Sequence, residues 1–196
     1  MGNTETKWIS NRDMLFISMM AALSFVVENS LGLVLIPVVS GIPLIGGTLS
    51  AIPDAAIVFL GAYLVPRRGA ILLFATILLT LSTITPSFGP PGLYKILIGV
   101  GLGLLFEILL LASRAGLAYV LATAIVFAAS IPMTYAAWLL FELPGVQYLG
   151  PKIRFLMMIY LVEGALGACL GWLLYQKRLS KLRSIRNIRE GKPTGQ

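Results

Sequence analysis

Basic residues lie almost wholly in every second gap between the apolar runs of this chain. Of the fifteen Lys and Arg residues, only Lys95, Lys152 and Arg154 lie beside the intervening gaps. The others are Lys7 and Arg12 before the first run, Arg67 and Arg68 after the second, Arg114 after the fourth, and seven bases from Lys177 to Lys192 after the sixth. Because positive residues collect on the cytoplasmic side of a membrane, this pattern predicts six spans with both termini in the cytoplasm.

The composition supports a membrane protein. Apolar residues make up 58% of the chain and charged residues only 12%, against about 25% in soluble domains. Each span needs about 20 residues, so 196 residues hold six spans and no sizeable soluble domain. We predict an all-α integral protein of the cell membrane with a cytoplasmic N-terminus (1–13), a six-helix membrane domain (14–176) and a basic cytoplasmic tail (177–196).

The net charge of +7 comes mainly from this tail. Bases interspersed with isoleucine and leucine are typical of an anchor on the inner leaflet, and a docking surface for a cytoplasmic partner is the alternative. We therefore expect no nucleic-acid partner.

The apolar runs and helix signals place the six spans. They are expected at about 14–36, 51–65, 69–85, 93–112, 116–141 and 153–175. Asn11 or Asp13 is expected to cap the first helix, and Pro132 to kink the fifth. Asp54, beside Pro53 in the first turn of the second span, is equally consistent with a cap and with a ligand-binding group.

Two segments between the spans are rich in proline and glycine. The segment 36–53 contains Pro37, Pro43 and Pro53 and carries no charge, and a second segment covers 86–92. Irregular backbone facing lipid would leave amide groups unpaired, while apolar side chains are poorly suited to water. We expect 36–53 to be irregular and to lie across the outer mouth of the bundle, as in a protein that captures a molecule from outside.

Charged residues inside the apolar runs are the candidate functional groups. Glu28 and Glu163 lie deep in the first and sixth spans, and Lys95 begins the fourth. Intramembrane charges are costly unless they face protein, water or a ligand. Glu28 and Glu163 either bind a ligand or join helices in protonated form, and Glu107 either has a role in transport or pairs with Arg114.

The sequence lacks the residues that several kinds of metal and catalytic site require. The chain has no histidine and a single cysteine, Cys169, so metal ligation, disulfides and histidine-assisted nucleophilic catalysis have no basis in the sequence. We expect no enzyme activity, no catalytic residue and no metal site.

The order of several short motifs resembles that of the substrate-binding S component of energy-coupling-factor (ECF) vitamin transporters. These motifs are Met19-Met20-Ala21-Ala22 in the first helix, Gly46-Gly47-Thr48-Leu49 before the Asp54 helix, Arg67-Arg68-Gly69-Ala70 in a basic turn, and Gly92-Leu93-Tyr94-Lys95-Ile96-Leu97-Ile98-Gly99 entering a glycine-rich helix. The resemblance covers nearly the whole chain. It departs at Ser18-x-x-x-Ala22, where the family often has Ala-x-x-x-Ala for docking on its transmembrane T component.

The resemblance implies a six-helix bundle that binds a vitamin or vitamin precursor near its outer surface. Mapped by position, the pocket comprises Glu28, Asn29, Phe88, Tyr94, Lys95, Trp138, Tyr148, Tyr160 and Glu163. Aromatic walls with a few polar groups suit a flat heterocycle, such as thiamine or its hydroxymethylpyrimidine precursor.

The partners that the resemblance implies are a T component, docking at Ser18 and Ala22, and two ATPase subunits. The chain has no Walker A pattern, so it is expected to bind no cofactor, with ATP used by the partner subunits. A stand-alone transporter or channel, with Glu28, Glu107 and Glu163 as a relay, is the alternative, followed by a structural membrane subunit.

Overall fold

The computed structural model describes residues 9–38, 45–86, 89–143, 146–182 and 189. For 32–38, 45–49 and Tyr148 the description covers the backbone alone. Phe88 and Pro43 lie outside the described residues.

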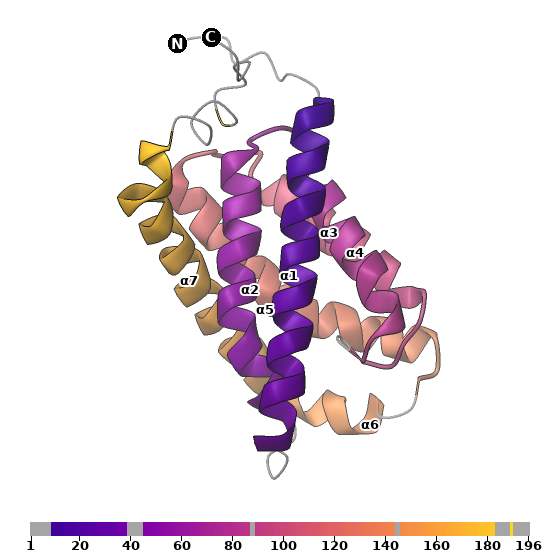
Figure 1. Ribbon diagram of the computed structural model, residues 1–196. Helices are drawn as coiled ribbons and strands as arrows, with labels where there is room; N and C mark the ends of the chain where they lie inside the picture. Colours follow the sequence, from indigo (N-terminus) through magenta and orange to yellow (C-terminus); the bar gives the residue numbers. More distant parts are fainter. Residues whose placement is uncertain (1–8, 39–44, 87–88, 144–145, 183–188, 190–196) are drawn as a thin grey trace.

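Within the described residues, six long helices form the bundle, and a short one crosses one end of it (Figure 1). The long helices are α1 (Asn11–Val38), α2 (Ile45–Leu64), α3 (Ala70–Leu81), α4 (Tyr94–Leu109), α5 (Gly116–Leu140) and α7 (Ile153–Lys177). The short elements are α6 (Val146–Leu149) and the 3-10 turns η1 (Ser82–Ile84), η2 (Gly150–Lys152) and η3 (Leu179–Lys181). The described chain contains no strand, which confirms the all-α prediction.

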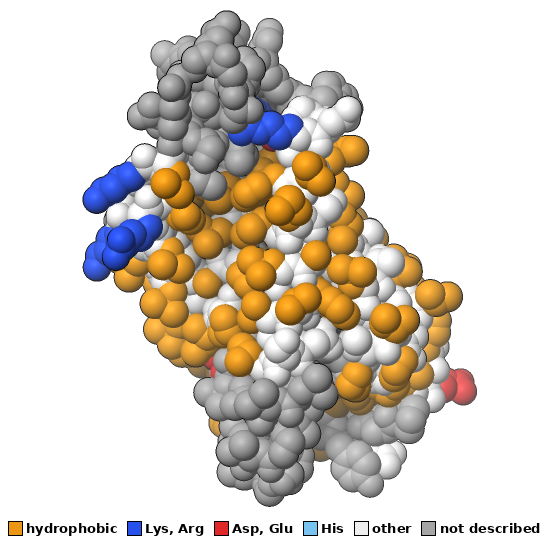
Figure 2. Space-filling model, in the orientation of Figure 1, with side chains coloured by type: hydrophobic (Ala, Val, Ile, Leu, Met, Phe, Trp, Pro, Cys, Tyr) orange, Lys and Arg blue, Asp and Glu red, His pale blue; other side chains and the backbone are white. Residues whose placement is uncertain are grey.

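The surface of the bundle is that of a membrane protein. Within the described residues, three helical stretches, 11–31, 116–140 and 150–181, are long and apolar enough to cross a membrane, and shorter apolar helices cover 50–64 and 70–84. Figure 2 shows apolar side chains over most of the visible face between the two ends. In water such a surface would favour aggregation, whereas lipid tails solvate it.

Basic side chains gather where α1 begins and α7 ends (Figures 1 and 2). We call this the basic end, and the opposite end, with the 85–92 connection and α6, the loop end. At the basic end, Arg114 donates to the Pro66 carbonyl oxygen at 2.6 Å and lies 3.9 Å from the Glu107 carboxylate. Glu107 also accepts from the Gly69 amide at 2.9 Å. The pairing of Glu107 with Arg114 is thus confirmed.

A reciprocal pair of hydrogen bonds caps the N-terminus of α1. The Asp13 amide donates to the Ser10 hydroxyl at 3.2 Å, and the Ser10 amide donates to the Asp13 carboxylate at 3.1 Å. This is a capping box with Ser10 as the cap, so the expectation of Asn11 as the cap is wrong. Arg67 lies 3.7 Å from Asp13 and joins this corner to the start of α3.

The expectation of irregular backbone throughout 36–53 is also wrong. Helix α1 continues to Val38, and α2 begins at Ile45, eight residues before Pro53. In an apolar setting a helix pairs backbone amides within itself, and Pro53 removes a single donor. Residues 39–44, between the two helices, lie outside the described residues. Of the second predicted segment, 86–92, the described residues, 86 and 89–92, are non-helical, as expected.

Glycines allow the helices to approach closely. On α7, a Cβ built on Gly167 would lie 2.3 Å from the Ile52 carbonyl oxygen of α2, and one on Gly164 would lie 3.0 Å from the Ala124 Cα of α5. On α4, Gly99 and Gly103 face the α3 backbone in the same way. In lipid, helix association depends on such packing. These glycines therefore serve contacts within the bundle.

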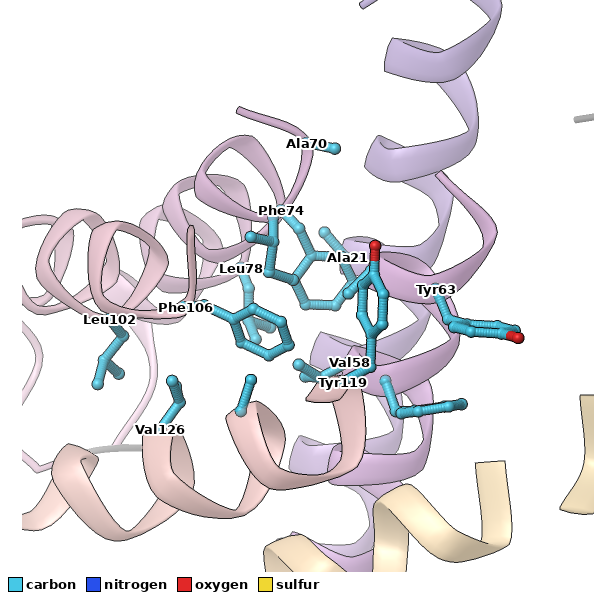
Figure 3. Packing of buried hydrophobic residues seen from close by; sticks show 14 of the residues in the cluster. Ala21, Val58, Tyr63, Ala70, Phe74, Leu78, Leu102, Phe106, Tyr119 and Val126 are labelled. Atoms are coloured by element: carbon cyan, nitrogen blue, oxygen red, sulfur yellow. The ribbon is translucent and has the colours of Figure 1, made fainter. Parts of the chain in front are cut away.

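Aromatic residues fill the centre of the bundle. Figure 3 shows Phe74 of α3, Phe106 of α4 and Tyr119 of α5 converging near Val58 of α2. At the basic end, Arg189 lies 4.2 Å from the centroid of the Tyr63 ring, a distance typical of a cation–π contact.

Two glycine-to-alanine changes test this packing. Gly167→Ala forces a methyl group against the α2 backbone and should cost about 1–3 kcal/mol. Gly101→Ala meets only the flexible end of Met133, at 3.3 Å, and gains helix propensity. In detergent, the apparent melting temperature should fall for Gly167→Ala and not for Gly101→Ala; equal values would contradict the packing described.

Candidate functional site

A cavity of about 650 Å³ opens inside the bundle. It reaches from Gly89, Trp138 and Leu149 near the loop end inward to Ile71 and Phe106. Its wall is contributed by α1 to α7 and the 85–92 connection, and most lining side chains are apolar. Both size and lining are typical of sites for small organic molecules.

A few polar side chains interrupt the apolar lining. They are Glu28 and Asn29 of α1, Ser50 and Asp54 of α2, Thr85 after η1, Tyr160 of α7, and three residues of α5, namely Ser130, Thr134 and Trp138. Among the described residues that line the cavity, Glu28 and Asp54 are acidic, and none is Lys or Arg. The described lining thus offers carboxyl groups, and no basic side chain, to a ligand.

Asp54 is held by a buried hydrogen bond between α1 and α2. Ser24, fully buried on α1, donates its hydroxyl proton to the Asp54 carboxylate, which is 4% exposed. A buried carboxyl group needs such donors, because its loss of hydration is otherwise uncompensated. Asn29 differs, since its side-chain amide donates to the Phe25 carbonyl oxygen of its own helix at 2.7 Å.

Three carboxyl groups surround Tyr160. Glu28, Asp54 and Glu163, from three different helices, all lie within electrostatic range of its hydroxyl. Glu163 is 9% exposed and does not line the cavity. Its Oε2 is buried and has no hydrogen-bond partner among the described residues. The acidic character of this side of the site therefore extends behind the cavity wall.

Tyr94 and Lys95 lie behind the opposite wall. Neither side chain lines the cavity. The Tyr94 hydroxyl donates to the Pro90 carbonyl oxygen at 2.7 Å, and the Lys95 ammonium group donates to three carbonyl groups of the connection between α3 and α4. The structure thus places both residues against the loop.

The other residues assigned from the sequence divide into those that line the cavity and those that do not. Glu28, Asn29, Trp138 and Tyr160 all line the cavity. Phe88 lies outside the described residues, and Tyr148 lies on α6 with its side chain outside the description. Ser18 is half-buried and Ala22 exposed, and neither lines the cavity.

Several lining residues carry a helical spacing that sequence reasoning missed. Ser130, Thr134 and Trp138 recur every four residues on α5, which places them on one face. Polar residues at this spacing in an apolar run are a detectable signal of a polar strip inside a bundle. Phe25 and Ser50 carry no comparable signal.

Comparison with known proteins gives one informative match. No family model and no curated protein matches the chain. A solved structure described as the crystal structure of an S-component of ECF transporter superposes with a TM-score of 0.53, over 94% of this chain and 95% of that chain. The chain has the S-component fold. Sequence identity is 20%, so this match establishes the fold, and the expected similarity of architecture is confirmed.

Removing the hydroxyl group that holds Asp54 tests the α1–α2 contact. Ser24→Ala leaves a buried carboxyl oxygen without its donor, at a cost of about 1–3 kcal/mol. Ser30→Ala, at an exposed position of the same helix, is the matched control. The apparent melting temperature should fall for Ser24→Ala alone, and an equal effect of the two changes would contradict this role.

Proposed function

We propose that this chain is the substrate-binding subunit of an ECF-type importer and has no catalytic activity of its own. The observation that carries the proposal is the cavity of about 650 Å³ inside a bundle with the S-component fold. Gly89, Trp138 and Leu149 bring the cavity wall to the loop end, opposite the basic end. The positive-inside rule turns the loop end outward, toward the source of an imported molecule.

The partners are a transmembrane T component and two ATPase subunits, as in the family that the sequence resembles. One side of α1 offers a surface for the T component, because Leu15, Met19, Ala22, Leu23 and Val26 are all exposed there. Ser18 and Ala22 provide the small residues that permit close helix approach on this surface. ATP is used by the partner subunits.

The ligand is a vitamin or vitamin precursor with an aromatic ring and a positive charge or strong hydrogen-bond donors. Trp138 and Tyr160 offer ring faces, and Glu28 and Asp54 offer carboxyl groups with no basic side chain among the described lining residues. Thiamine, a cation, and its hydroxymethylpyrimidine precursor, a neutral aminopyrimidine, both suit this lining.

Mass spectrometry of the molecule that copurifies with the chain tests the function directly. We expect about one small heterocycle per chain, bound without transport. Reconstituted in liposomes, the chain should import that molecule only with the T component and ATPase subunits. ATP-independent uptake by the chain alone would overturn the proposal and favour a stand-alone carrier.

Neutralising Glu28 tests the site. Glu28→Gln keeps the shape of the side chain and removes its charge, so the affinity for thiamine should fall about tenfold or more, whereas that for the neutral precursor should change less. Glu142→Gln, at an exposed acid beyond α5, is the control. Calorimetric titration measures both, and unchanged thiamine affinity in Glu28→Gln would remove this assignment.

A further inference from the structure

Lys95 is a buried cation whose ammonium group is bound by backbone carbonyl oxygens. It is the second residue of α4, and its side chain is 0% exposed. Its Nζ donates to the carbonyl oxygens of Ser82 at 3.0 Å, Thr85 at 2.6 Å and Gly89 at 3.1 Å. An ammonium group has three protons to donate, and each of these oxygens is an acceptor within hydrogen-bond distance.

Two of the three carbonyl groups, those of Thr85 and Gly89, belong to residues that line the cavity, and that of Ser82 lies just before them in the chain. Ser82 and Thr85 lie at the carboxyl end of α3 and η1, the end of a helix that attracts positive charge, and the Ser82 carbonyl oxygen also accepts from the Thr85 amide at 3.1 Å. Thr85, Pro86 and Gly89 line the cavity. Lys95, which does not itself line the cavity, therefore holds this part of the wall in place. We call its hydrogen bonds to the three carbonyl oxygens the Lys95 grip.

The same wall is held from the side of α5. A Cβ built on Gly89 would lie 2.1 Å from the Trp138 ring, so the indole packs directly on the Gly89 backbone, whose φ of +100° also favours glycine. Within the connection, the Gly89 amide donates to the Pro86 carbonyl oxygen at 3.1 Å and the Gly92 amide to that of Thr83 at 2.9 Å. Trp138 itself lines the cavity.

We propose that Lys95 is a positioning residue, which holds residues 82–86 and 89–92 in their ligand-receptive arrangement without touching the ligand. This inference rests on the proposed function, because that function makes the cavity a ligand-binding site. The hydrogen bonds of Lys95 do not depend on it. A wall fixed before binding spares the ligand the cost of ordering it, so loss of the grip shortens the lifetime of the complex.

Hydrogen exchange in the ligand-free protein tests the grip. Lys95→Met removes the ammonium group and keeps most of the side-chain volume. Exchange at the Gly89 and Gly92 amides should rise by about tenfold or more, while that of the middle of α4 stays unchanged. Lys152→Met, at an exposed lysine of the same end, is the control. Unchanged exchange at both glycines in Lys95→Met would overturn the inference.

Binding of the neutral hydroxymethylpyrimidine separates positioning from direct contact. Glu28 lies within electrostatic range of Lys95, so a cationic probe would also sense the altered charge. For the neutral probe, Lys95→Met should raise the dissociation rate about fivefold or more. Gly89→Ala, which disturbs the contact of the same wall with Trp138, should also raise the dissociation rate. In the double variant the dissociation rate should rise by less than the product of the two single fold-changes.

The outcomes distinguish this inference from the proposed function. Loss of affinity in Lys95→Met without faster exchange would show that Lys95 contacts the ligand, and faster exchange with unchanged affinity would show that the grip does not serve binding. Either result overturns the positioning role of Lys95.

If the wild-type chain binds no heterocycle, the proposed function fails. The exchange data still show whether Lys95 holds the connection in place. If Lys95→Met does not fold, Lys95→Arg, which retains charge and donors, should keep slow exchange and Gly89→Ala should lose it.

Discussion

The structure depends on one constraint, which is that backbone amide groups in an apolar environment must find partners inside the protein. Helices satisfy this constraint along most of the described chain. Where the chain leaves the helix after α3, the constraint remains, and a buried ammonium group meets it by taking three carbonyl oxygens. The same constraint explains why α2 continues through Pro53, since a helix with one missing donor leaves fewer amides unpaired than an irregular segment does.

The overall architecture follows from the sequence because hydropathy and charge report directly on the solvent around each segment. The predicted bounds of the fifth and sixth spans, 116–141 and 153–175, agree closely with α5 at Gly116–Leu140 and α7 at Ile153–Lys177. The start of α2 was missed because Gly46, Gly47 and Pro53 lower helix propensity, while the gain from pairing amides in an apolar setting outweighs propensity. The sequence does not single out the Ser10 cap, because three of the four residues from Ser10 to Asp13 have plausible capping side chains.

The site was only partly predictable. Glu28 and Tyr160 stand out in the sequence as polar residues in apolar runs, and both line the cavity. Lys95 stands out equally, yet its side chain faces the loop. Sequence gives the depth of a charged residue in the membrane and not its rotation about the helix axis, because the apolar residues around it surround the helix on all sides. Spacing restores some of this information, as at Ser130, Thr134 and Trp138.

At the basic end, Glu107 and Arg114 join the two turns that follow α2 and α4. Glu107 accepts from the Gly69 amide and pairs with Arg114, which in turn donates to the Pro66 carbonyl oxygen. Four successive helices, α2 to α5, are thereby fastened to each other at one extremity. These contacts oppose separation of the four helices at the basic end, so a molecule that left the cavity between them at this end would have to break the contacts first.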